Sequence, residues 1–406
     1  MAKATLLFLF TLLIRLQAHI LLPVYRDPDT FQFLTTIHRG TSSTPTRLVL
    51  DLGGPFVWAD HAASSIPVHR CSLPCFKAKA FVNGDGGATC FYNAIGNAQI
   101  GNCELSAVNS VTGSVAEAEL VEDHLELRSV LEPSVKIKNV IFTTAPASLL
   151  SGLATGANGM LGLGKSNIGF LSQISNAIAS QRKFSLCLSS SDGVLLLGDL
   201  DINTVSRSKV SDALMYTPLI NRLGSDGDTL DYFITVKSIR INGQKLPIDI
   251  EAIGGTKMST VVPYTILSRG IYGTFIKAYE AAALSMNMTR AAPVSPFGLC
   301  FRAEGIDETP MGLNVPPIDL ILQSEMVRWR VVGKNTMVRV GGGDRVCVGL
   351  VEGGAAMDEA IVVGGLQLVD NLMEFNVGTG MLGFNVMKQS SCLSIARSSS
   401  VSAAAL

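Results

Sequence analysis

The 406-residue sequence predicts a mostly β fold built from many short strands and few short helices. Its 39 Gly and 16 Pro are typical of strands joined by turns, and its aromatic content is low, at 6%. Short apolar or alternating runs bounded by turn residues recur along the chain, whereas helical spacing of apolar residues appears in few places. With 47% hydrophobic residues, the chain can bury one large core or two medium ones.

Residues 1–18 are predicted to form a secretory signal peptide. Lys3 precedes an apolar run from Ala4 to Ile14 that is too short to span a bilayer, and Ala18 offers a small residue at the cleavage position. Leu16 is larger than the residue usually found three positions before cleavage. A buried N-terminal strand is the alternative, which the crowding of Leu and Phe beside an N-terminal Lys disfavours. We therefore expect a secreted, extracellular protein.

Strands and helices can be assigned along the chain. Strands are expected where short apolar runs end at turn residues, at 47–50, 194–198, 231–236 and 361–364. Helices are expected where apolar residues recur every three or four positions, at 168–178 and 268–284. The C-terminal segment 393–406, whose end is rich in Ser and Ala, is predicted to be disordered.

Charge and glycine patterning argue against several functions. The chain has 32 basic and 33 acidic residues, so no global field attracts nucleic acid or an anionic membrane. The Gly-rich stretches 156–164 and 341–343 lack the Lys-Ser/Thr of a phosphate loop and are expected to be turns. We therefore expect no cofactor and no metal.

Eight cysteines favour disulfides, because an even number in an exported chain usually means pairing. Four crowd the first half and four are spread over the second, namely Cys71, Cys75, Cys90, Cys103, Cys187, Cys300, Cys347 and Cys392. A zinc site is the alternative, since Cys71 and Cys75 have a spacing that zinc sites also use. Asn287-Met288-Thr289 is a glycosylation acceptor sequence, which predicts that Asn287 lies on the surface.

The sequence also contains a coarse internal duplication. In each half an apolar strand leads to a special turn, and about a hundred residues later an apolar-apolar-Gly element follows. These elements are Asp51-Leu52-Gly53-Gly54 with Met160-Leu161-Gly162, and Ser259-Thr260-Val261-Val262 with Val362-Val363-Gly364. Two similar lobes that meet at a cleft are therefore predicted, at residues 19–213 and 214–392.

These turns and several longer stretches resemble the pepsin-like aspartic protease family. The resemblance runs from about residue 22 to residue 392. It is carried by Asp51-Leu52-Gly53-Gly54-Pro55-Phe56-Val57-Trp58, Gly159-Met160-Leu161-Gly162-Leu163-Gly164, Lys183-Phe184-Ser185-Leu186-Cys187-Leu188, Ser259-Thr260-Val261-Val262-Pro263-Tyr264-Thr265 and Gly364-Gly365-Leu366-Gln367-Leu368-Val369-Asp370-Asn371-Leu372. Within the family the chain is similar to the plant branch of extracellular dermal glycoprotein, basic 7S globulin and the xylanase and xyloglucanase inhibitor proteins. The resemblance implies a bilobal fold of two similar β-barrel-like lobes.

Aspartic proteolysis needs two carboxylates that share one proton, and each lobe of an active relative supplies one from an Asp-Thr/Ser-Gly turn. The first lobe here keeps Asp51. It has Leu52 where the hydroxyl that grips the opposite loop belongs, and Gly54 where a supporting Ser is usual. In the second lobe the resemblance places Ser259 at the second Asp and Val261 at its Gly. The pair is therefore degenerate, and neither Asp51 nor Ser259 is expected to be catalytic.

Other features of the sequence agree with this loss. Segment 104–127, where the substrate-covering flap of the family should lie, contains no Tyr. Without a second carboxylate, like-charge repulsion should not raise the pKa of Asp51, which is expected to titrate as an ordinary or partly buried acid. A Ser-His-Asp site is not indicated, because all five His lie in the first 124 residues and nothing around Ser259 resembles a nucleophile elbow.

The resemblance also bears on disulfides and on inhibitory contacts. It implies the pairs Cys300–Cys347 and Cys187–Cys392, whereas the four first-half cysteines allow three connectivities. Xylanase-inhibiting members carry a His shortly before the last Cys, but here Met387-Lys388-Gln389-Ser390-Ser391 precedes Cys392. Lys388 is the remaining candidate for a positive inhibitory contact, and a solvated surface lysine is the alternative.

The resemblance implies a binding protein of the plant apoplast or cell wall. Its partner in plant defence would be a microbial glycoside hydrolase, either a xylanase or a xyloglucan-specific endoglucanase. We expect a monomer that binds neither nucleic acid nor membrane. Two alternatives stay open, an aspartic-type endopeptidase with an altered active site and a storage or peptide-binding protein like the globulins. Abundance in seed would favour storage, whereas pathogen-induced secretion and association with a glycosidase would favour inhibition.

Overall fold

The computed structural model describes residues 20–60, 65–82, 101–129, 134–199, 214–224, 227–355 and 357–386. The predicted signal peptide (1–18) and disordered tail (393–406) fall outside these ranges. Within them, no helix combines the length and apolar character needed to cross a membrane. The predicted mostly β class is confirmed, because strands dominate both halves of the chain and the helices are few and mostly short.

Six strands of the first half close into a barrel. They follow the order β2-β3-β9-β4-β8-β7, and a further pairing of β2 with β7 completes the ring. β3 is buried over Leu48, Val49 and Leu50, as expected for a strand that pairs in parallel with β9 inside the sheet. The bounds are β2 (Phe33–Arg39), β3 (Thr44–Asp51), β4 (Val57–Ala59), β7 (Ser114–Leu127), β8 (Val135–Thr144) and β9 (Gly159–Gly162), with β5 (Ile66–Pro67) and β6 (Glu104–Asn109) paired to β7.

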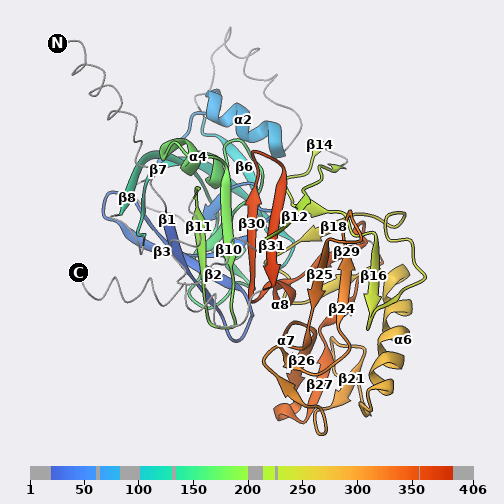
Figure 1. Cartoon of the computed structure of the whole chain (residues 1–406). Coiled ribbons are helices and arrows are strands. Elements are labelled where there is room, and N and C mark those ends of the chain that lie inside the picture. Colours follow the sequence, from blue (N-terminus) through green and yellow to red (C-terminus); the bar gives the residue numbers. More distant parts are fainter. Residues whose placement is uncertain are drawn as a thin grey trace, which may run out of the picture.

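The same sheet continues through strands from both halves of the chain, in the order β12-β31-β30-β10-β11-β1. These strands are β1 (Ile20–Arg26), β10 (Lys183–Cys187), β11 (Asp192–Leu197), β12 (Met215–Pro218), β30 (Asn371–Asn376) and β31 (Met381–Val386). Figure 1 shows the red strands β30 and β31 beside the green strand β10. Strands from the predicted second lobe thus join the sheet of the first. The lobe boundary near residue 213 stays a prediction.

The second half adds three sheets of four or five strands and α6, the longest helix among the described residues. A five-stranded sheet, β15-β18-β29-β19-β28, carries the second special turn. Its strands are β15 (Phe233–Ile234), β18 (Thr256–Met258), β19 (Thr265–Leu267), β28 (Leu350–Glu352) and β29 (Ile361–Val363). Two four-stranded sheets, β17-β16-β24-β25 and β20-β21-β27-β26, lie beyond it. They contain β16 (Ser238–Ile241), β17 (Gln244–Lys245), β20 (Arg290–Ala291), β21 (Cys300–Arg302), β24 (Ile318–Ile321), β25 (Arg328–Val331), β26 (Met337–Val340) and β27 (Arg345–Val348).

The helices pack against these sheets. Both predicted helices are present, as α4 (Phe170–Ala177) and α6 (Arg269–Ser285). α6 runs along the outer side of the second lobe in Figure 1 and buries Ile271, Phe275 and Tyr279, which stand four residues apart on one face. The remaining elements are α2 (Leu73–Val82), α7 (Gly333–Thr336), α8 (Gly365–Leu368), the 3-10 turns η2 (Ala147–Leu150) and η4 (Gly341–Gly343), and the strand pairs β13 (Leu223–Gly224) with β14 (Gly227–Asp228) and β22 (Glu308–Thr309) with β23 (Gly312–Leu313).

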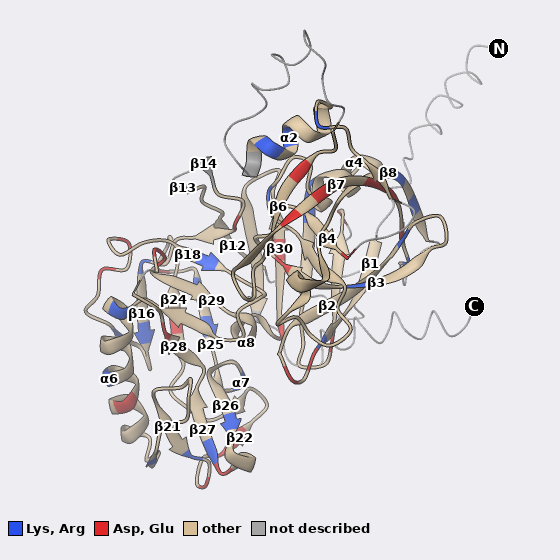
Figure 2. Ribbon diagram, turned by 180° about the vertical axis from the view of Figure 1, so that it is seen from behind, with Lys and Arg blue, Asp and Glu red and all other residues tan. Residues whose placement is uncertain are grey.

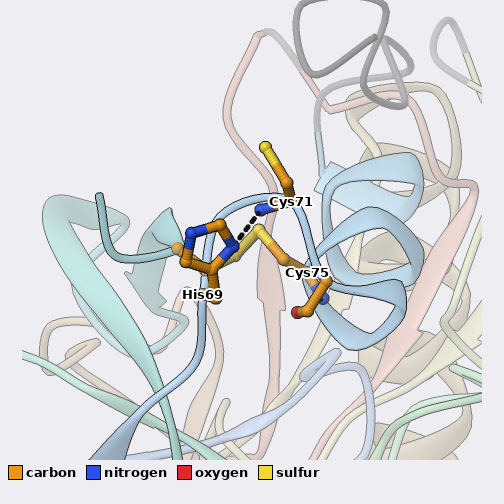
Figure 3. Close-up of a disulfide and its surroundings, with 5 residues drawn as sticks. His69, Cys71 and Cys75 are labelled. Atoms are coloured by element: carbon orange, nitrogen blue, oxygen red, sulfur yellow. Dashed lines mark hydrogen bonds between the residues drawn. A yellow bond between two sulfur atoms is a disulfide. The ribbon is translucent and has the colours of Figure 1, made fainter. Parts of the chain in front are cut away.

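Disulfides fix loops in both lobes. Cys300 and Cys347 are bonded across β21 and β27, with sulfurs 2.03 Å apart. Cys75 of α2 is bonded to Cys103 next to the imidazole of His69, which accepts a hydrogen bond from the backbone N–H of Cys71 (Figure 3). Cys71 and Cys75 are both disulfide-bonded, so their spacing reflects disulfide formation rather than zinc binding.

Two of the eight cysteines, Cys90 and Cys392, lie outside the described residues. Cys187 is disulfide-bonded. The pairing of Cys187 with Cys392 stays a prediction, since one partner is not described.

Candidate functional site

The two special turns occupy equivalent places in the two lobes. Asp51 ends β3, which pairs in parallel with β9, and Ser259 directly follows β18, which pairs in parallel with β29. The backbone N–H of Gly53 donates to Asp51 Oδ1 over 3.0 Å, and the N–H of Val261 donates to Ser259 Oγ over 3.3 Å. The same local geometry therefore presents a carboxylate from one lobe and a hydroxyl from the other.

Thr260 joins the two turns. Its hydroxyl donates to the carbonyl of Leu50 over 2.7 Å and accepts from the N–H of Leu52 over 3.2 Å. The side chain of Leu52 is apolar and fully buried, so it offers no hydroxyl to the opposite turn. The second lobe therefore supplies a hydroxyl that hydrogen-bonds to the opposite turn, whereas position 52 of the first lobe supplies none.

Asp51 lies beneath the tip of the flap and is 5% exposed. Its Oδ2 accepts a hydrogen bond of 2.5 Å from Ser110 Oγ. A Cβ at Gly54 would lie 2.9 Å from this same Oδ2, so position 54 has no room for a supporting serine. Ser110, from the turn after β6, therefore supplies the hydroxyl contact that Gly54 lacks.

Burial raises the pKa of Asp51, and the hydrogen bonds from Ser110 and Gly53 act against this shift. Asp231 raises the pKa further and Lys257 lowers it, both by smaller amounts. The sequence-based expectation of no like-charge contribution is wrong, because Asp231 brings a second carboxylate near the site from outside the two turns.

Asp231 and Lys257 form an ion pair of 2.9 Å beside the first turn. A Cβ at Gly53 would lie 2.0 Å from Asp231 Oδ1, so only glycine leaves room for this carboxylate. Sequence reasoning missed Asp231 because it lies far from both turns along the chain and belongs to no motif. In the sequence, the only indication that another group lies close to the first turn is the glycine at position 53.

The flap is the hairpin of β6 and β7, and it is fastened without a tyrosine. Trp58 Nε1 donates to the carbonyl of Val108 over 3.0 Å. Asn109 Nδ2 donates to the carbonyls of Leu149 and Ser151 over 2.8 and 3.0 Å. Together with the Ser110–Asp51 bond, these contacts hold the flap tip against the rest of the first lobe.

A cleft of about 560 Å³ lies between the lobes under the flap. The first lobe contributes Asp51, Pro55 and Val108 to its lining. The second lobe contributes the Asp231–Lys257 pair, Ser259 and Glu359, together with apolar walls from Met258, Val261, Val262, Ile266, Met357 and Val362. The described residues include no cluster of His, Cys, Asp and Glu arranged to hold a metal ion.

Of two further predicted sites, Asn287 is described and is not part of the cleft lining. Asn287 is exposed just after α6, in a left-handed conformation with φ of 60°. Its side chain is therefore accessible for glycosylation, which stays a prediction. Lys388, the candidate inhibitory contact, lies outside the described residues.

Comparisons with known proteins cover both lobes. A family model described as xylanase inhibitor N-terminal matches residues 33–199, and one described as xylanase inhibitor C-terminal matches residues 231–386. The chain is 37% identical to the probable aspartic proteinase GIP2 of Nicotiana benthamiana, over 92% of this chain and 90% of that protein. It is 31% identical to gamma conglutin 1 of Prunus dulcis, over 90% of this chain and 86% of the relative.

Solved structures show the same arrangement. The crystal structure of edgp superimposes with a TM-score of 0.83 at 33% identity, covering 94% of this chain and 98% of that one. Basic 7S globulin from soybean superimposes with a TM-score of 0.76 at 25% identity, covering 91% of this chain and 95% of that one. Similarity at this coverage extends to the whole bilobal fold rather than to one lobe.

Proposed function

Because the chain belongs to the xylanase-inhibitor family of pepsin-like proteins, we propose that it is a secreted, non-catalytic protein that binds and inhibits a microbial cell-wall glycoside hydrolase. A xylanase or a xyloglucan-specific endoglucanase is the proposed target class. The proposed setting is plant defence, in the apoplast or cell wall, with the protein acting as a monomer.

One observation supports the non-catalytic part of this proposal. Asp51 and Ser259 occupy equivalent places in the two turns, so one turn presents a carboxyl group and the other a hydroxyl. Aspartic proteolysis needs a second carboxyl group that shares a proton with the first. Ser259 has no acidic proton to share. Asp231 does not replace it, because its carboxylate is ion-paired with Lys257 and comes from outside the turns.

The inhibitory part of the proposal follows from the family and from the chemistry of the target. Glycoside hydrolases carry two carboxyl groups in their substrate cleft, and a cationic side chain inserted there can pair with them. Lys388 is the proposed contact, since it stands near the last Cys of the chain. The disulfides of the described residues support the proposed secretion.

The first experiment separates catalysis from binding. The purified mature protein is incubated with casein at acidic pH, alongside Asp51→Asn and Ser259→Asp, and a pull-down from fungal wall glycosidases follows. We expect no cleavage by the native protein, none by Asp51→Asn, and 1:1 retention of a glycosidase whose activity falls on binding. Casein cleavage that a pepstatin-type inhibitor stops would instead establish an endopeptidase with an altered site.

A storage or peptide-binding role is the second candidate. It is supported by similarity to gamma conglutin and basic 7S globulin and by the open cleft between the lobes. A protein that accumulates in seed and retains no glycosidase would favour this candidate over inhibition.

A further inference from the structure

The interlobe cleft has the size and lining of a small-molecule site, although its proteolytic carboxylate pair is absent. Its volume of about 560 Å³ lies within the range of ligand pockets. Most side chains on its second-lobe wall are apolar, and they come from β18, β19, β29 and the loops next to them. The cavity is present while Ser110 holds the flap tip on Asp51, so it does not require an open flap.

The charges that line the cleft do not balance. Lys257 is neutralised by Asp231 at 2.9 Å, and the carboxyl of Asp51 is buried and accepts hydrogen bonds from Ser110 and Gly53. Glu359 is half-buried in the cleft wall, and its side chain makes no ion pair or hydrogen bond with any described residue. Glu359 therefore lines the cleft, beside its apolar wall, with no partner among the described residues.

A partly desolvated carboxylate beside apolar walls is complementary to a cation with an apolar body. We propose that the cleft binds a small amphiphilic cation, whose apolar part lies against Ile266, Met357 and Val362 and whose ammonium or guanidinium group pairs with Glu359. Such a ligand buries its apolar part and supplies the counter-charge that the lining lacks. This proposal does not rest on glycosidase binding.

The test compares three probes of one shape, 3-phenylpropylamine, 3-phenylpropan-1-ol and 3-phenylpropionate, titrated into the full protein. Methyl NMR signals of Met357 report on the cleft, and those of Met326, which is 89% exposed and not part of the cleft lining, report on non-specific contact. We expect the amine to shift the Met357 methyl at lower concentration than the alcohol, and the carboxylate to bind weakest.

Substitution of Glu359 tests the proposed contact. Glu359→Gln should weaken amine binding about two- to fivefold and leave the alcohol unaffected, because a partly exposed ion pair contributes modestly. Glu325→Gln, which removes an exposed glutamate of the Arg240 ion pair, is the matched control and should change neither the amine affinity nor the alcohol affinity. The proposal would be overturned by equal affinity for amine and alcohol or by tighter binding of the carboxylate. An unchanged amine affinity in Glu359→Gln, or shifts confined to Met326, would overturn it as well.

Discussion

Asp51 is the one acidic residue at a position where active aspartic proteases have a pair. Its carboxyl is buried, accepts the Ser110 hydroxyl, and has its pKa raised mainly by desolvation. A raised pKa means that the folded protein holds this proton more tightly than the unfolded chain does. The contribution of Asp51 to stability therefore falls as pH rises from the ordinary value for Asp through the raised pKa.

Asp51→Asn should remove this pH dependence, because an amide cannot ionise; its oxygen can still accept from the Gly53 N–H, and its NH2 group can donate to the hydroxyl oxygen of Ser110. We expect the variant to be more stable than the native protein at pH 7, by about 1.4 kcal/mol for each pKa unit of the shift. The difference should vanish near pH 3, where the carboxyl is protonated in both states. Calorimetric Tm values between pH 3 and 7 measure it. Asp27, whose pKa is lowered by hydrogen bonds from Thr30, gives the control, and an equal gain from Asp27→Asn would contradict the interpretation.

At the residue level, the sequence was informative where chemistry is local. Asp51 and Ser259 could be placed because each belongs to a contiguous turn with its own motif. Ser110 and Asp231 could not, because only the folded chain brings them to Asp51 from the flap and from a distant loop. The expectation that no like charge raises the pKa of Asp51 was wrong for the same reason, since it depended on a neighbour, Asp231, that no motif records.

The flap hairpin carries an unfavourable arrangement of charge. Glu104 on β6 stands directly opposite Glu119 on β7, and Glu117 follows on the same face of β7. These acids give the hairpin the red segments visible in Figure 2. Like charges directly opposite each other destabilise a strand pair. The hairpin is instead held by the contacts of Trp58, Asn109 and Ser110 at its tip.

Glu104→Lys should therefore stabilise the flap, because it converts a like-charge pair into an attractive one. We expect a gain of roughly 0.2–1 kcal/mol, seen as slower hydrogen exchange of the β6 and β7 amides. Glu104→Gln is the matched control, which removes the repulsion without adding an attraction, and should give about half the effect. Faster exchange in the lysine variant would show that the acidic face is not a source of strain.

Elements with strong periodicity were predictable, and those fixed by tertiary contacts were not. The strands expected at 47–50, 194–198 and 361–364 and both expected helices are present. The strand expected at 231–236 is reduced to Phe233–Ile234, next to Tyr232, which is buried and donates its hydroxyl to the carbonyl of Leu163. Helix α2 was missed, although Ser72, which caps the N–H of Cys75, followed by Pro74 is a helix-start signal.

Over the whole molecule, a sheet shared by the two halves joins the lobes. Phe184 of β10 stacks on Phe375 of β30 with ring centroids 4.8 Å apart, and Tyr232 packs against both rings. Two lobes could be predicted from the duplication in the sequence. Their shared sheet could not, because strand pairing between residues so far apart leaves no local pattern.

Phe375→Ala should destabilise both lobes together, because the lost ring joins strands from both. We expect a loss of about 3–5 kcal/mol, typical of a buried Phe, within a single calorimetric transition at lower temperature. Phe275→Ala, which empties a similar volume under α6 in the second lobe alone, is the matched control. The thermal transition of Phe275→Ala should broaden or split. A split transition in Phe375→Ala but not in Phe275→Ala would argue against a core shared by the two lobes.

The position of β10 has a consequence for biosynthesis. One side of β10 pairs with β11 soon after it is made, whereas its other side waits for β30, near the C-terminal end of the chain. Until residues 371–376 leave the ribosome, the nascent first lobe carries an open strand edge, which is a template for aggregation. Chains truncated before β30 should therefore accumulate as insoluble or chaperone-bound species rather than as a free-standing first lobe.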